Sequence, residues 1–135
     1  MPYLPEIPET PAPNDDDAPF WAHCNQQRLM FQHCPRCTAV THPPLAVCPG
    51  CQACEREWIE APARAIVFSY TWIHTAAHNA VAPRLPYNVA GVAFPDLPGV
   101  QLVSNVVDAV FGELAIGDEL ELVWEPGWQG QWLPR

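Results

Sequence analysis

The sequence predicts a mainly β fold in which a short helix and a ribbon of small strands precede a five-stranded barrel. Four cysteines are grouped as two C-x-x-C units, Cys34–Cys37 and Cys48–Cys51. From residue 61 onward, short apolar runs with strand-like alternation are separated by Pro and Gly turns. With 49% hydrophobic residues, a chain of 135 residues can bury a core, as one domain or as two small units.

Residues 1–17 are predicted to be a flexible leader, because five prolines and a closing Asp triplet leave little apolar surface to bury. A leader that becomes ordered on a partner is the alternative. Asp17 suits the N-cap of a helix over residues 18–27. The aromatic side chains of that helix, Phe20 and Trp21, either pack against the ribbon or anchor another protein.

The two C-x-x-C units predict a rubredoxin-like zinc ribbon within residues 18–60. Paired units at this spacing aim four thiolates at one Zn²⁺, about 2.3 Å from each sulfur. A thioredoxin-like redox site needs one such unit at the start of a helix, and disulfides need an oxidising compartment. Both are alternatives, and zinc is favoured over them. The predicted ligands are Cys34, Cys37, Cys48 and Cys51, among strands expected at 29–33, 40–47 and 57–60.

The identity of the fourth ligand stays open, because Cys54 extends the second unit to C-x-x-C-x-x-C. Cys51 is favoured, since Gly50 tolerates the left-handed backbone that such a turn needs. His33 and His42 are weaker substitutes. Four thiolates fill a tetrahedral ion and leave no position for water, so the predicted zinc is structural.

Residues 61–135 predict an OB-fold. Five short antiparallel strands with one helical turn after the third are typical of this small Greek-key barrel. The first strand would carry Ile66, Phe68, Tyr70 and Trp72 on one face. The strands are expected at 65–74, 87–94, 100–107, 119–124 and 128–133, and the helical turn at 111–114.

The charge distribution disfavours a nucleic-acid partner. The net charge is −9, and none of the six basic residues is a lysine. Binding to phosphates normally needs a basic stripe. A single-stranded nucleic-acid module is still the alternative function, since OB-folds and zinc ribbons both bind DNA and RNA. The sequence has no apolar run near 18 residues and no signal peptide, so no membrane partner and a cytoplasmic location are expected.

Several short motifs follow one another in a specific order between residue 18 and the C-terminus. They are L-M-F-Q-H-C-P-R-C at 29–37, C-P-G-C at 48–51, F-S-Y-T at 68–71, P-Y-N-V-A at 86–90, L-V-S-N-V-V at 102–107 and I-G-D at 116–118. In these motifs the chain resembles a family of bacterial and archaeal zinc-ribbon plus OB-fold proteins that are associated with acyl-CoA. It departs from the family at Gln27 and in the extra Cys54.

The resemblance implies an accessory role without catalysis of its own. Such proteins are small subunits of thiolase-fold enzymes, including thiolases and the aldolases of steroid side-chain breakdown, and others associate with acyl-CoA hydratases. The expected assembly is an α2β2 hetero-oligomer in lipid, aromatic or steroid degradation. The partner would carry the chemistry, and this chain would stabilise it and help to form its acyl-CoA pocket.

The residues themselves contain no motif of an independent active site: G-x-S-x-G, a Gly-rich phosphate loop and H-E-x-x-H are all absent. No catalytic residue is therefore predicted. Side chains that would contact coenzyme A or substrate, unless they belong to an ordinary loop, are His74, His78 and Arg84. Tryptophan favours interfaces, so a partner surface or simple barrel-end packing is expected at Trp124, Trp128 and Trp132.

Overall fold

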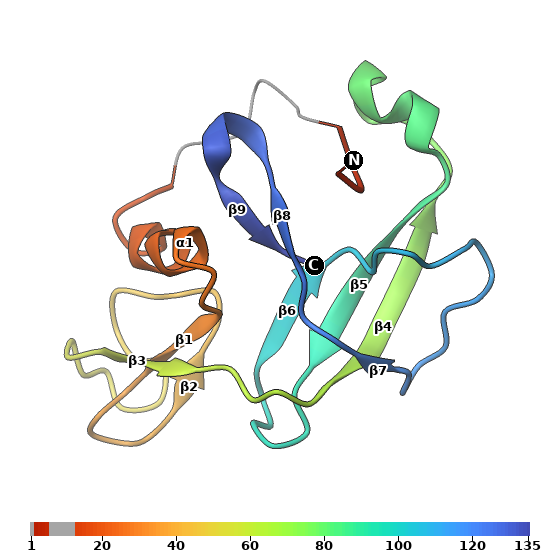
Figure 1. Cartoon of the computed structure of the whole chain (residues 1–135). Helices are drawn as coiled ribbons and strands as arrows, with labels where there is room; N and C mark the ends of the chain where they lie inside the picture. The colour runs from red at the N-terminus through yellow and green to blue at the C-terminus, as the bar shows by residue number, and fades with distance from the viewer. Residues whose placement is uncertain (1, 6–12) are drawn as a thin grey trace.

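The computed structural model describes residues 2–5 and 13–135, which form a mainly β protein with one short α-helix (Figure 1). No helix in these ranges is long and apolar enough to span a membrane. The elements, with η for 3₁₀ helices, are α1 Ala18–Asn25, β1 Met30–His33, β2 Val40–Thr41, β3 Glu57–Glu60, β4 Ala65–Ile73, η1 Asn79–Arg84, β5 Tyr87–Ala93, β6 Gln101–Ser104, β7 Glu119–Leu120, β8 Trp124–Pro126, η2 Trp128–Gly130 and β9 Trp132–Pro134.

The helix α1 starts where the sequence predicted, but by a different device. The Asp17 side chain makes no capping hydrogen bond, so the predicted side-chain cap is wrong. Asn14 does this work instead: its Oδ1 accepts from the backbone N–H groups of Asp16 at 2.8 Å and Asp17 at 3.0 Å. The helix ends at Asn25, and Gln27 follows in a left-handed conformation with φ 55°.

The ribbon is a three-stranded antiparallel sheet in the order β2-β1-β3. The return strand expected at 40–47 is only two residues long. Beyond it the chain is held by a side chain instead of a strand partner. Gln32 Nε2 donates to the Leu45 carbonyl at 2.9 Å, and the Leu45 N–H donates to Gln32 Oε1 at 2.9 Å. Pro43 and Pro44 have no N–H to donate, which explains the early end of the strand.

The larger lobe is a four-stranded sheet in the order β6-β5-β4-β7, with the β8–β9 hairpin beside it (Figure 1). Ser104 Oγ in β6 donates to the Pro134 carbonyl in β9 at 2.7 Å, which joins the hairpin to the sheet. The strand expected at 119–124 is split, because β7 pairs with β4 whereas β8 pairs with β9. The helical turn expected at 111–114 is absent, since Gly112 has φ 88° and cannot continue a helix.

A β-bulge in β4 overturns the face predicted for its side chains. Val67 pairs with Val92 and Ser69 with Gly91, so Phe68 is the extra residue. Val67 is fully buried, whereas Phe68 is 51% exposed. The one-face prediction for residues 66, 68, 70 and 72 is therefore wrong, because the bulge shifts every later side chain by one position.

One hydrophobic core joins the helix, the ribbon and the barrel sheet. Phe31 in β1 is fully buried, and its ring meets that of Phe94 after β5 with 5.2 Å between centroids. The segments on either side of the boundary expected between residues 60 and 61 thus share one core. The buried members of this cluster are Phe20, Cys24, Leu29, Phe31, Val92, Phe94, Val100 and Leu102.

Candidate metal centre

The two C-x-x-C units fold into two knuckles with the same hydrogen bonds. The Cys34 N–H donates to the Ala39 carbonyl at 2.9 Å, and the Thr38 N–H donates to the Cys34 carbonyl at 2.9 Å. The second knuckle repeats this pattern fourteen residues later: Cys48 N–H to Ala53 O at 2.9 Å and Gln52 N–H to Cys48 O at 2.9 Å. Equivalent turns give the four sulfurs a pseudo-symmetric arrangement around one point.

The left-handed residue in each knuckle is not glycine. Thr38 and Gln52 both have φ 64°, whereas Gly50 does not have a positive φ. The role expected for Gly50 is therefore wrong. A Cβ at this position would make ordinary van der Waals contacts, 3.4 Å from Cys37 Sγ and 3.7 Å from Cys48 Sγ, so space does not require glycine here either.

The four sulfurs fit one tetrahedral ion. Cys34 Sγ lies 3.6 Å from Cys51 Sγ, and Cys37 Sγ lies 3.5 Å from Cys48 Sγ. All four sulfurs lie within 4.8 Å of one another. Four Zn–S bonds of about 2.3 Å would place the sulfurs about 3.8 Å apart, and a disulfide would bring a pair to about 2.05 Å. The spacing matches a metal centre and not two disulfides.

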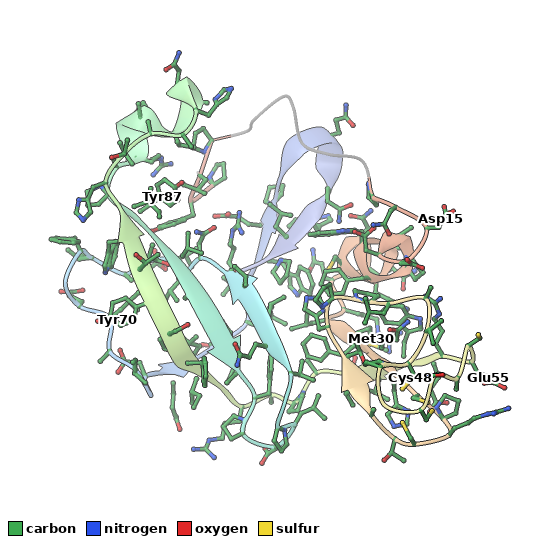
Figure 2. The ribbon with its side chains drawn as sticks, turned by 180° about the vertical axis from the view of Figure 1, so that it is seen from behind. Asp15, Met30, Cys48, Glu55, Tyr70 and Tyr87 are labelled. Carbon is green, nitrogen blue, oxygen red and sulfur yellow. The ribbon has the colours of Figure 1, made fainter. Side chains whose placement is uncertain are left out.

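Backbone N–H groups favour the thiolate form that a metal requires at two of the four sulfurs. The N–H groups of Cys51 and Gly50 lower the pKa of Cys48 to about 7. The pKa of Cys34 is lowered in the same way, first by the N–H of Cys37. At Cys37 and Cys51 a backbone N–H also lowers the pKa, but desolvation and the neighbouring sulfurs raise it overall, to about 12 at Cys51. Figure 2 places Cys48 in the ribbon lobe, on the other side of the molecule from Tyr70.

The alternative ligands lie elsewhere. Cys54 is exposed and does not belong to the sulfur cluster. His33 Nδ1 lies 2.6 Å from Glu57 Oε1. His42 packs between aromatic rings, with centroids 4.8 Å from Phe20 and 5.3 Å from Phe31. The structure thus resolves the fourth position in favour of Cys51.

His42 is expected to make stability depend on pH. Burial lowers its pKa below the ordinary 6.5, and Nδ1 is buried with no hydrogen-bond partner among the described residues. As the pH falls, the unfolded chain takes up this proton first, so the stability that His42 contributes above pH 6.5 is lost below it. The unfolding temperature should therefore fall more steeply between neutral and acidic pH for the wild type than for His42→Phe. Equal slopes would contradict this, since zinc loss acts on both proteins.

The three loop residues proposed to meet coenzyme A or substrate make three separate contacts. The His74 ring packs edge-on against Phe111, with 5.2 Å between centroids. His78 Nδ1 accepts from the Ala80 N–H at 3.0 Å at the start of η1. Arg84 Nη2 donates to the Pro2 carbonyl at 2.7 Å. Each retains its sequence-based role only as a prediction.

The aromatic residues proposed for a partner surface divide between core and edge. Phe20 is buried in the core, and Trp21 packs edge-on against it with 5.1 Å between centroids. Trp124 is half-buried against the same core, and Trp132 is half-buried in β9. The side chain of Trp128 lies outside the described residues.

Sequence reasoning missed a set of exposed apolar side chains on the larger lobe. Phe111 packs against Trp72 with 5.4 Å between centroids, yet 55% of it is exposed. The only hint in the sequence is a run of apolar residues in a segment predicted to be a helical turn. The exposed set on this lobe is Phe68, Tyr70, Val103, Val110, Phe111, Ile116, Leu122 and Val123.

Every arginine already has an acceptor. Five form ion pairs: Arg28 with Glu60, Arg36 with Glu55, Arg56 with Asp16, Arg64 with Glu119 and Arg135 with Glu125. The sixth, Arg84, donates to a backbone carbonyl. The described surface therefore offers no row of unpaired cations, and the nucleic-acid alternative gains no support.

The chain matches two family models, and both describe parts of ChsH2. The ChsH2 rubredoxin-like zinc ribbon domain matches residues 21–53, and the ChsH2 C-terminal OB-fold domain matches residues 58–125. These matches confirm the predicted fold class, with a zinc ribbon first and an OB-fold second. They also confirm a zinc-ribbon metal centre, since the zinc ribbon match at residues 21–53 contains all four clustered cysteines.

Solved structures are similar across most of the chain. A chain of the "Ltp2-ChsH2(DUF35) aldolase" is 33% identical with a TM-score of 0.83, over 93% of this chain and 95% of that chain. A DUF35-family protein of unknown function from Sulfolobus solfataricus shares the fold at 22% identity and TM-score 0.59, over 78% of this chain and 75% of that chain.

A curated relative is similar in sequence but much longer. A protein of Thermomonospora curvata, named as a probable enoyl-CoA hydratase alpha subunit, is 34% identical over 114 residues. The match covers 84% of this chain and 34% of the relative. The chain therefore spans about a third of the length of that relative.

Proposed function

The chain belongs to the ChsH2 family, and from this membership we propose that it is an accessory subunit of an acyl-CoA-processing enzyme, without catalysis of its own. The observation that carries the proposal is the 33% identity and TM-score of 0.83 to a chain of the Ltp2-ChsH2 aldolase over nearly the whole length of both. The 34% identity to a probable enoyl-CoA hydratase alpha subunit is a second observation that supports a link to acyl-CoA substrates.

The chemistry of the metal centre is consistent with an accessory role. Four cysteine sulfurs would complete a tetrahedral zinc ion and leave no coordination position for substrate or water. The residues that would hold the ion are Cys34, Cys37, Cys48 and Cys51. Such an ion supplies folding free energy to a small domain and no Lewis acidity to a reaction. The reduced thiols that it requires fit a cytoplasmic location.

The proposed partner is a thiolase-fold subunit that cleaves a C–C bond by thiolysis or retro-aldol chemistry, in an α2β2 complex. This chain would stabilise the partner and help to form its acyl-CoA pocket. A cavity of about 530 Å³ between the larger lobe and residues 27–29 of the ribbon part could contribute to it. It is lined by apolar residues such as Val92, Leu102 and Leu120, with Ser104 and Asn105 among its polar groups.

Reconstitution tests this proposal. The chain would be co-expressed with candidate thiolase-fold, aldolase and hydratase subunits from the same genome. Turnover of acyl-CoA substrates would be measured for each subunit alone and for each pair. We expect one stable complex whose activity needs both subunits. Turnover by this chain alone, or a partner equally active without it, would contradict the proposal.

A further inference from the structure

The end of the barrel sheet where β5 begins carries a polar site that the chain's own N-terminal segment fills. Residues 2–5 lie beside β8 and near η1, far from the start of α1 (Figure 1). Arg84 Nη2, at the end of η1, donates to the Pro2 carbonyl at 2.7 Å. The Tyr3 N–H donates to Glu125 Oε1 in β8 at 2.6 Å. Two separate elements therefore bind the carbonyl and the N–H of the same peptide group, the one that joins Pro2 to Tyr3.

Asn88 is the centre of this site. It is fully buried, and its backbone N–H and its Nδ2 both donate to the Tyr3 hydroxyl oxygen, at 3.0 and 2.8 Å. The rest of its side chain is fixed by Val106, whose N–H donates to Oδ1 at 2.7 Å and whose carbonyl accepts from Nδ2 at 2.8 Å. One phenolic oxygen thus accepts from the backbone N–H of Asn88 and from one hydrogen of its Nδ2, while the other hydrogen of Nδ2 goes to Val106.

The acidic residue of the site, Glu125, is held in place by an ion pair with Arg135. Glu125 Oε2 lies 3.0 Å from Arg135 Nε, and the two side chains are only 16% and 14% exposed. The guanidinium balances the carboxylate, which leaves Oε1 free to accept a backbone N–H. The site therefore offers a complementary group to a carbonyl, to the N–H of the next residue and to that residue's phenol.

We propose that Arg84, Asn88 and Glu125 form a recognition site for a tyrosine-bearing peptide segment, and that residues 2–5 occupy it as a detachable strap. This goes beyond the accessory role and does not depend on it. The site is connected to the wall of the 530 Å³ cavity, because Val106 and Arg135 line that cavity and contact Asn88 and Glu125. Occupancy of the site would thus fix one part of the cavity wall.

A peptide assay tests the site directly. The strap and its site belong to one chain, and an effective concentration of about 1 mM for such intramolecular binding means that nine-tenths occupancy requires a peptide Kd below about 0.1 mM. A chain that starts at Pro13 should bind a labelled peptide of residues 1–12 within that limit, as measured by fluorescence anisotropy. The intact chain should bind it at least about tenfold more weakly, since its site is filled.

The matched control is the same peptide with Tyr3→Phe, which keeps the ring and removes the oxygen. It should bind the shortened chain about tenfold more weakly. Equal binding of both peptides would overturn the assignment of Asn88 as a phenol-recognising group. Absence of binding up to about 1 mM, by a shortened chain that is folded, would overturn the site as a whole.

If the shortened chain does not fold, the intact protein carries the test. Hydrogen exchange at the amides of Asn88 and Val106 should become about tenfold faster in Tyr3→Phe and remain unchanged in Tyr70→Phe, whose hydroxyl lies on β4. Unchanged exchange in Tyr3→Phe would overturn the proposal. A concentration-dependent dimer that Tyr3→Phe dissociates would also overturn it, because the strap would then belong to a second copy.

Discussion

Replacement of Cys48 by serine is expected to abolish zinc binding and to unfold the ribbon. Zinc-binding free energies of about 10–16 kcal/mol in zinc-finger peptides appear as folding free energy, and this exceeds the stability of a small domain. Bound metal per chain, measured by mass spectrometry of the purified protein, should fall from one ion to almost none. Cys34→Ser should behave in the same way.

Cys54→Ser is the matched control for this experiment. Cys54 is exposed and lies only three residues beyond Cys51, but its sulfur is outside the cluster. This variant should retain its zinc and its unfolding temperature. The Cys48→Ser variant should also lose its complex with the partner subunit. A zinc-free variant that still supported full partner activity would refute the structural role of the metal.

Phe31→Ala is expected to destabilise the ribbon and the barrel together. The Phe31 side chain is fully buried and meets Phe94 across the boundary between the two lobes. Removal of a core phenylalanine costs about 3–5 kcal/mol, a large part of the stability of a domain of this size. Chemical denaturation followed by tryptophan fluorescence and by far-UV circular dichroism should show one shared transition at lower denaturant.

Phe68→Ala removes the same side chain from an exposed position in β4, and it should change stability by less than about 0.5 kcal/mol. Two separate transitions in the wild type, with only one of them shifted by Phe31→Ala, would contradict a shared core. That result would instead support independent domains at residues 18–60 and 61–135.

The metal ligands were predictable because their geometry is local. Two residues between cysteines fix a knuckle, and two knuckles with matching turns bring four sulfurs together wherever the rest of the chain goes. The conformation within the knuckle was less predictable. Thr38 and Gln52, which directly follow the second cysteine of each knuckle, adopt the left-handed backbone that was expected at Gly50.

Strand positions were predictable where a short run rich in apolar residues is bounded by proline, as in β5 between Pro86 and Pro95. The bulge at Phe68 was not, because the register of β4 depends on pairing with β5 and not on its own pattern. The strap was also beyond local reasoning. The proline content of residues 1–17 predicts a flexible leader. The hydrogen-bond partners of Tyr3 are 85 and 122 residues away in the sequence, so no local pattern could indicate them. Residues 6–12 of that leader lie outside the described residues.

The complete pairing of the arginines has a consequence for how coenzyme A would be shared within a complex. Its phosphates need cations, yet this chain has a net charge of −9 and its arginines are already engaged. In the proposed complex, most of the cations around the nucleotide end of the cofactor would therefore come from the other subunit, with Arg84 as the predicted contact from this chain. The same negative field would speed the encounter with a basic partner and slow it as salt is added.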